Sequence, residues 1–290
     1  MQIGIDSYSF HRFFGETYPG IEADPGKRLT VWDFLDHVVS LGVGAVSLES
    51  AFLDAGDTAL IDDLRRKLDA QGLERVWAWG HPRGFRSGQE PAAMEDARRS
   101  LRAAQSLGAG VMRICAGGRG TRMASWPQMR EALLPLLSDL TREAQRAGVV
   151  LAVENHIDLF ADELLDLVES IGSPYFGICL DTANNLRMYE NPREVLRKLA
   201  PHTKATHIKD IIALGGDPGT IAFWPSVATG EGLIDMAEVV SVLRGVNYGG
   251  VLAIEIDYLA PGQGDEFAAL ARSVTNLRRI LDGQPALPRG

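Results

Sequence analysis

Short apolar segments alternate with longer amphipathic segments along almost the whole chain. The apolar segments predict eight strands, at residues 2–6, 45–49, 73–80, 111–116, 149–154, 177–181, 205–209 and 251–256. The segments between them carry apolar residues at helical spacing and predict eight helices, at residues 31–41, 58–70, 91–107, 126–147, 162–171, 192–199, 235–243 and 266–281. A glycine follows five of these helices and suits a left-handed helix end, as at Gly72 and Gly148.

Eight short strands that alternate with helices predict an α/β protein, a single-domain (β/α)8 TIM barrel. An open doubly wound sheet would carry a glycine-rich turn after its first strand, but here that turn reads Asp-Ser-Tyr-Ser. No linker divides the chain, so we expect one domain over residues 1–282 and a flexible Pro/Gly-rich tail over 283–290. The two longest connections, 7–30 and 210–234, fall at the C-terminal ends of strands, where barrels place their active sites.

The composition of the chain argues against nucleic acids and membranes as binding partners. The 290 residues carry a formal net charge of −9, and both nucleic acids and anionic membranes require a basic surface. No apolar segment reaches the roughly 18 residues that a membrane span needs. Cys115 and Cys179 lie in apolar runs without a CxxC pair, and the first residues lack the pattern of a signal peptide. We therefore expect two buried free thiols in a cytoplasmic protein.

Four consecutive predicted strands end in a residue that can bind a metal: Glu154, Asp181, His207 and Glu255. In a barrel these strand ends meet at one mouth, so the four side chains can converge. Three carboxylates and one imidazole suit a divalent ion, with Mn²⁺ expected and Mg²⁺, Co²⁺ or Zn²⁺ as alternatives. Side chains alternate along a strand, so the residues two positions earlier also point inward. All four are small, which leaves room for the site: Ala152, Cys179, Ala205 and Ala253.

Several of these segments resemble the sugar isomerase/epimerase superfamily of xylose isomerase-like TIM barrels, which includes ketose 3-epimerases, hydroxypyruvate isomerases, inosose dehydratases and oxo-sugar lyases. The resemblance covers about residues 4–281 and is carried by Glu-Asn-His at 154–156, Leu-Asp-Thr at 180–182, His-Ile-Lys-Asp at 207–210, Gly-Glu-Gly at 230–232 and Ile-Glu at 254–255. It implies one metal ion held by the four residues named above, with both glutamates beside the substrate. One position departs from the ketose 3-epimerases, which carry a histidine where this chain has Asn184.

The chemistry that follows is proton removal next to a carbonyl, through an enediolate that the metal ion stabilises. Glu154 and Glu255 are the candidate catalytic bases, and His156 is a third. The leading hypothesis is a metal-dependent sugar isomerase or epimerase. The alternative is a lyase on an oxo-sugar, by β-elimination, as in dehydratases and C-glycoside deglycosidases, or by decarboxylation. The short Gly-Gly-Arg-Gly run at 117–120 is a weak phosphate-binding signal, so we expect an unphosphorylated sugar or sugar derivative.

Two further classes of protein fit less well. An apurinic-site endonuclease would need more histidine ligands and a basic surface, and a barrel that only binds sugar would not need a complete set of ligands and bases. The expected partner is a small sugar substrate, with a homo-oligomer or a small partner subunit left open.

The remaining candidates are substrate contacts, each with a structural alternative. Lys209 could bind an oxyanion or pair with Asp210 or a loop carboxylate, and Arg113 could contact substrate or pair with Glu49. The aromatic residues of the two long connections could form an apolar roof over the substrate or simply pack. The roof would consist of Phe13, Phe14 and Tyr18 from the first connection and Phe223 with Trp224 from the second. The other candidate contacts are His11, His81, Asn184 and Trp224.

Overall fold

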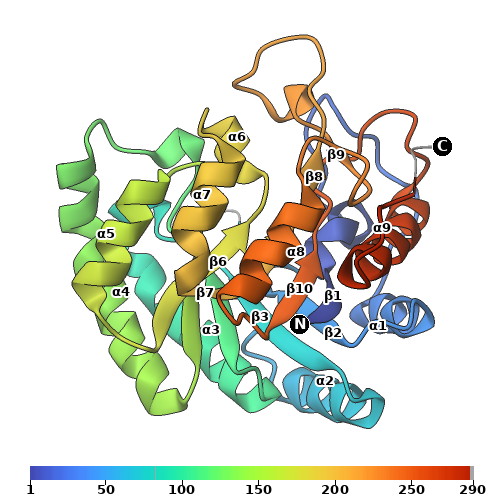
Figure 1. Ribbon diagram of the computed structural model, residues 1–290. Helices are drawn as coiled ribbons and strands as arrows, with labels where there is room; N and C mark the ends of the chain where they lie inside the picture. Colours follow the sequence, from blue (N-terminus) through green and yellow to red (C-terminus); the bar gives the residue numbers. More distant parts are fainter. Residues whose placement is uncertain (82, 288–290) are drawn as a thin grey trace.

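The computed structural model describes residues 1–81 and 83–287. Its parallel strands close into a barrel in the order β1-β10-β7-β6-β5-β4-β3-β2, with helices on the outside, which confirms the TIM barrel (Figure 1). The barrel strands are β1 (Gln2–Asp6), β2 (Ala45–Glu49), β3 (Glu74–Trp79), β4 (Val111–Ile114), β5 (Val150–Glu154), β6 (Phe176–Asp181), β7 (Thr203–Ile208) and β10 (Val251–Ile254).

The helices lie where the apolar periodicity places them, with small shifts at their ends. They are α1 (Val31–Ser40), α2 (Thr58–Gln71), α3 (Met94–Leu107), α4 (Trp126–Ala147), α5 (Ala161–Ile171), α7 (Pro192–Leu199), α8 (Met236–Gly245) and α9 (Glu266–Leu281). Glycines in the left-handed region follow α2, α3, α4 and α5, as the sequence predicts. Helix α3 begins three residues later than expected, because residues 91–93 form a separate 3-10 turn.

Both long connections contain structure that the periodicity does not predict. Residues Ser7–Phe14 form a 3-10 segment, capped by the side chain of Asp6. The connection after β7 holds a two-stranded antiparallel sheet, β8 (Asp210–Ile211) with β9 (Ser226–Val227). A four-residue helix, α6 (Asn184–Arg187), follows β6. These short elements come after barrel strands and build the mouth above the strand ends.

The barrel interior carries the small residues expected below the candidate ligands. Ala152, Cys179 and Ala205 form a buried cluster of their own, separate from the main core between strands and helices. Ala253, two residues before Glu255, belongs to a second interior cluster. The prediction of a small-residue layer beneath the site is therefore confirmed. Cys115 and Cys179 are free and buried, also as expected.

The last helix of the barrel, α9, lies beside the first, α1. Arg278 of α9 donates to the carbonyl oxygens of Leu41 and Gly42, at 2.8 and 2.7 Å, and so links α9 to the end of α1 (Figure 1). The described part of the tail, residues 283–287, bonds to α9 through Leu287, whose N–H lies 3.0 Å from Asn276 Oδ1. Residues 288–290 of the expected flexible tail lie outside the described residues. Among the helices that the structure describes, none has the length and apolarity of a membrane span.

Candidate active site and metal centre

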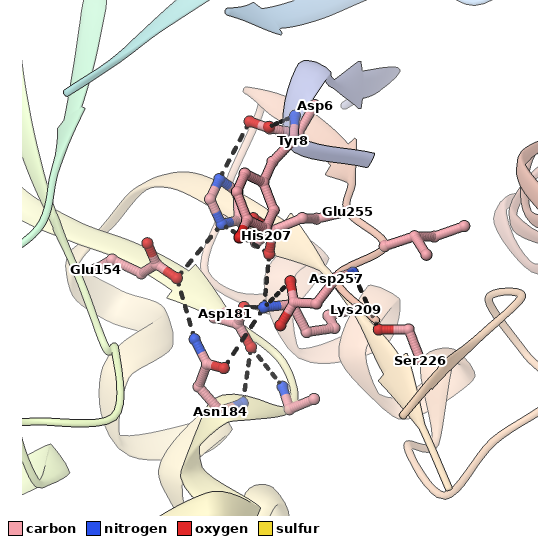
Figure 2. Close-up of polar contacts among 12 residues, drawn as sticks. Asp6, Tyr8, Glu154, Asp181, Asn184, His207, Lys209, Ser226, Glu255 and Asp257 are labelled. Atoms are coloured by element: carbon pink, nitrogen blue, oxygen red, sulfur yellow. Dashed lines mark hydrogen bonds and ion pairs between the residues drawn. The ribbon is translucent and has the colours of Figure 1, made fainter. Parts of the chain in front are cut away.

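Glu154, Asp181, His207 and Glu255 converge at the C-terminal mouth of the barrel (Figure 2). Parallel pairing places Asp181 beside His207, and His207 beside Ala253, two residues before Glu255. One ligand atom from each of the four residues lies within 4.8 Å of the others. All four residues are buried, with at most 4% of their surface exposed.

Three buried atoms of this group make no hydrogen bond: His207 Nδ1, and Asp181 Oδ2 and Glu255 Oε2, which contact the Lys209 ammonium as ion pairs. A buried polar atom without a hydrogen bond is costly, and a divalent ion would bind the lone pair of His207 Nδ1 while adding to the positive charge that Lys209 brings to the two carboxylates. Carboxylate oxygens and an imidazole nitrogen at this spacing are the donor set of a divalent metal ion. The residues present therefore fit such an ion.

Asp6, at the end of β1, orients the imidazole of His207. Its Oδ2 lies 3.4 Å from His207 Nε2, which leaves Nδ1 facing the carboxylates of Glu154 and Glu255 at 3.4 and 3.3 Å. A carboxylate behind a metal-binding histidine fixes its tautomer and ring position. Burial opposes the charge on Asp6, but the hydrogen bond and charge of His207 outweigh it and lower the pKa of Asp6.

Lys209 extends into the same group from the end of β7. Its Nζ lies 2.9 Å from Asp181 Oδ2, 2.6 Å from Glu255 Oε2 and 3.0 Å from Asp257 Oδ1. Of the alternatives open for Lys209, the pair with Asp210 does not form, whereas the pair with a loop carboxylate does, at Asp257. The other two carboxylates belong to the metal group.

Asp210 instead closes the connection after β7. Its carboxylate accepts backbone N–H groups of Gly230, Gly232 and Ile234 at 2.9, 2.9 and 3.1 Å. A Cβ on Gly232 would lie 2.2 Å from Asp210 Oδ1, so the Gly-Glu-Gly segment gives the backbone room to reach this carboxylate. The N–H of Ile211 is a fourth donor, at 3.0 Å. Burial raises the pKa of Asp210 to about 6, although these four backbone donors favour its ionised form.

Arg113 holds Glu154 in place. Its guanidinium lies 2.9 Å from Glu154 Oε2 and 3.0 Å from Glu49 Oε1, which confirms the predicted pair with Glu49. Asn184 Nδ2 donates to the other oxygen of Glu154 at 3.1 Å. Burial opposes ionisation, but Arg113 and His207 lower the pKa of Glu154 well below its usual value. Glu154 is therefore ionised, as both a ligand and a base require.

A cavity of about 220 Å³ lies at the mouth, above the metal group. Six of the predicted site residues line it: His81, Arg113, Glu154, His156, Lys209 and Glu255. The first connection contributes Tyr8 and Tyr18, whose hydroxyl groups lie 2.9 Å apart. His81 bonds through Nε2 to Glu16 Oε1 at 2.7 Å, so it lies beside these phenols.

His156 has the geometry of a base. Its Nδ1 lies 2.8 Å from the carbonyl oxygen of Gly117, which can only accept, so Nδ1 carries the proton and Nε2 the lone pair. Burial lowers the pKa of His156, despite the opposing charge of Glu154, and keeps the ring neutral near pH 7. Asp158 lies buried nearby, accepting the Ser87 hydroxyl at 3.3 Å, and burial raises its pKa to about 7.

Three predicted substrate contacts, His11, Asn184 and Trp224, do not line the cavity. His11 is fully buried one layer behind it, with Nδ1 on the Tyr8 carbonyl and Nε2 on Glu22, both at 2.9 Å. Asn184 is also fully buried and acts on Glu154 instead. Trp224 bonds to the Pro218 carbonyl at 2.9 Å, at the base of the 219–221 segment that does line the cavity.

Of the roof residues predicted in the first connection, the two phenylalanines pack against the core, whereas Tyr18 lines the cavity. Phe13 is buried against Phe10 and Phe267, with ring centroids 5.8 and 5.3 Å away. Phe14 stacks on Phe52 at 4.9 Å. These rings attach the connection to the core, and the two tyrosines face the cavity in their place.

Sequence reasoning missed several residues of the site. Asp6 ends a strand, as the four ligands do, and Asp257 lies two residues after Glu255, so position alone could have identified both. Tyr8 and Arg187 also line the cavity but come from long or irregular connections with no periodic signal. Tyr18, an expected roof residue, and Arg119, from the glycine-rich run, line it as well.

A family model described as xylose isomerase-like TIM barrel matches residues 35–279. The chain belongs to the xylose isomerase-like TIM barrel family. Among curated relatives, the 3-oxo-isoapionate decarboxylase of Pectobacterium atrosepticum is 24% identical over 246 residues, covering 84% of this chain and 81% of the relative.

Solved structures of the same fold cover nearly the whole chain. A xylose isomerase domain protein from Planctomyces limnophilus matches with a TM-score of 0.74 at 22% identity, covering 97% of this chain and 98% of that protein. A D-psicose 3-epimerase solved in the presence of D-fructose matches with a TM-score of 0.74 at 15% identity, covering 97% and 99%. Proteins of the same fold thus include one named an epimerase, and a relative in sequence is named a decarboxylase. This chain has a buried group suited to a divalent metal ion.

Proposed function

We propose that this member of the xylose isomerase-like family is a divalent-metal-dependent isomerase or epimerase of an unphosphorylated sugar or sugar derivative. The observation that carries the proposal is that Glu154 and Glu255 both belong to the metal group and both line the cavity. Two carboxylates that flank one reacting carbon can remove a proton on one side and return it on the other.

The residues around the two glutamates have different roles in the proposed reaction. Arg113 and Asn184 hold the carboxylate of Glu154, and Lys209 holds that of Glu255 at 2.6 Å. A divalent ion bound by the four ligands would polarise the substrate carbonyl and stabilise the charge that develops on its oxygen. The glutamates then transfer the proton between carbon atoms or faces, and the buried surroundings exclude water.

A lyase acting on an oxo-sugar is the second candidate. His156 lines the cavity and is neutral, with the lone pair on Nε2. It therefore offers a third base, which proton transfer between Glu154 and Glu255 does not need. The 24% identical relative is named a decarboxylase, and Asn184 stands where ketose 3-epimerases carry a histidine. Elimination or decarboxylation passes through the same kind of enolate as isomerisation does.

Deuterium exchange separates these candidates. Free ketoses and 3-oxo-glycosides are incubated with the Mn²⁺-saturated protein in D₂O, and NMR follows exchange and product. Glu154→Gln and Glu255→Gln should each lower turnover at least ~10²-fold, because a general base contributes at least that much. Glu143→Gln is the control, since Glu143 pairs with Arg98 on the outer helices.

Exchange at the parent rate in both glutamine variants would refute the two-base mechanism. Loss of exchange in His156→Ala alone would favour the lyase. We further propose Mn²⁺ as the ion and the cytoplasm as the compartment, in keeping with the buried free thiols. A homo-oligomer or a small partner subunit stays a prediction, which light scattering of the purified protein would check.

A further inference from the structure

An arginine without an acidic partner stands on the wall of the cavity. Arg119 belongs to the Gly-Gly-Arg-Gly run, which the proposed chemistry does not use. It lines the cavity and is half-buried, and its guanidinium donates to the backbone carbonyl of Arg187. Among the described residues, no carboxylate lies within ion-pair distance of it. A half-buried cation in this position has donors left for an anionic ligand.

Arg187 adds a second free donor to the same wall. Its side chain is 7% exposed and lies 2.9 Å from Asp257 Oδ2, and it also donates to the carbonyl oxygen of Trp224 at 3.3 Å. Its Nε is buried and has no partner. Because buried N–H groups are nearly always satisfied, this one indicates an acceptor that a ligand supplies.

The charges of the cavity are unevenly placed. Arg187 and Lys209 share the single carboxylate of Asp257, and the other carboxylates near Lys209 belong to the metal group. The first connection instead presents the phenols of Tyr8 and Tyr18, and burial raises the pKa of both, so they stay neutral. The cavity lining therefore combines the guanidinium groups of Arg119 and Arg187 with the neutral phenols of Tyr8 and Tyr18.

We propose that the substrate is a sugar acid whose carboxylate binds Arg119 and the Nε–H of Arg187, at the end away from the reacting carbonyl. This inference rests on the proposed function and names its substrate class. A guanidinium binds a carboxylate through two parallel hydrogen bonds, and the free donors here match the two oxygens of that group.

A carboxylate bound in this way anchors the substrate and is not lost as CO₂. An ion pair with arginine stabilises the anion, whereas decarboxylation converts that anion to neutral CO₂ and loses the pair. The carboxylate on Arg119 therefore survives the reaction. Proton transfer takes place at the other end of the molecule, between Glu154 and Glu255, and no further reactant is required.

Three commercially available compounds test this directly. L-Sorbose and 5-keto-D-gluconate share one carbon skeleton and one configuration, and differ only at the carbon farthest from the carbonyl, a hydroxymethyl group in one and a carboxylate in the other. 2-Keto-L-gulonate carries its carboxylate next to the carbonyl instead. Each is titrated by calorimetry into Mn²⁺-loaded protein, so the readout is binding and needs no turnover.

We expect 5-keto-D-gluconate to bind roughly 10- to 100-fold more tightly than L-sorbose, which is the contribution of hydrogen bonds to a charged group. Arg119→Met should remove that preference and leave L-sorbose binding unchanged, and Arg119→Lys should restore part of it. Arg83→Met is the matched control, because Arg83 is exposed after β3 and does not line this cavity.

Equal binding of L-sorbose and 5-keto-D-gluconate, or no binding of the keto acid, would overturn the inference. So would a preference that survives Arg119→Met, an equal loss for both compounds in that variant, or tighter binding of 2-keto-L-gulonate. Tighter binding of D-fructose 6-phosphate than of 5-keto-D-gluconate would assign the arginines to phosphate. If the carboxylate preference holds but no oxo-sugar exchanges deuterium, the proposed function fails while the assignment of Arg119 stands.

Discussion

Replacing Lys209 with methionine removes the one ammonium that lies among three buried carboxylates. Its Nζ contacts Asp181, Glu255 and Asp257 at 2.9, 2.6 and 3.0 Å, and the Lys209 side chain is only 3% exposed. Methionine keeps the length and apolar stem of the side chain but not the charge. In the metal-free protein, Asp181 and Glu255 would then lose the ammonium between them, and Asp257 would keep only Arg187.

The size of the effect follows from burial. Removing one partner of a buried ion pair destabilises a protein by about 3–5 kcal/mol. The entropy of unfolding for 290 residues is about 0.6 kcal/mol/K, at roughly 2.1 cal/mol/K per residue. Lys209→Met should therefore lower the Tm of the metal-free protein by about 5–8 °C.

Thermal unfolding followed by circular dichroism, in EDTA and in saturating Mn²⁺, measures this change. The metal ion supplies positive charge to Asp181 and Glu255, so Mn²⁺ should raise the Tm of the variant more than that of the parent. Lys198→Met is the control: Lys198 pairs with Asp162 at 2.5 Å on the surface, where such a pair contributes about 0–1 kcal/mol. The reasoning is refuted if Lys209→Met leaves the Tm unchanged, or if the loss is the same with and without Mn²⁺.

Three further changes probe the surroundings of the site. Asp6→Asn should weaken Mn²⁺ binding by about 10–100-fold in calorimetry, because it loosens the orientation of His207; unchanged affinity would contradict this. Asp158 ionises near 3.8 when unfolded and at about 7 when folded, so the native state keeps a proton that the unfolded chain has lost, and parent stability falls as pH rises through this window. Asp158→Asn has no such proton to lose. Its free energy of unfolding in urea, relative to that of the parent, should therefore rise by about 3 kcal/mol between pH 5 and pH 8; a difference in unfolding free energy that stays constant with pH would show that Asp158 ionises normally. Trp224→Ala should raise KM several-fold without lowering the Tm by more than a few degrees, because Trp224 supports the 219–221 segment of the cavity wall. Unchanged kinetic constants would show that Trp224 only packs against its neighbours.

The fold and the metal group were predictable because both depend on strand positions. Alternation of apolar segments places the barrel strands, and a parallel barrel brings consecutive strand ends to one mouth. Glu154, Asp181 and His207 lie at or within one residue of their strand ends, and Glu255 follows directly after β10. The same rule applied to β1 would have added Asp6.

The walls of the cavity were not predictable in the same way. Tyr8 and Tyr18 face the cavity while Phe13 and Phe14 face the core, and apolarity alone does not tell these aromatic residues apart. The partners of Lys209 depend on how far the segment after β10 turns back towards β7, which a sequence pattern does not contain. Loop conformations of this kind follow from tertiary contacts rather than from local periodicity.

Titration of Mn²⁺ into metal-free protein tests the central claim most directly, namely that the four strand-end residues hold one divalent ion. Calorimetry should give one site per chain for the parent protein. His207→Ala should weaken that site at least ~100-fold, because it removes the only nitrogen ligand of the group. Absence of a site in the parent, or an unchanged affinity in His207→Ala, would contradict the account.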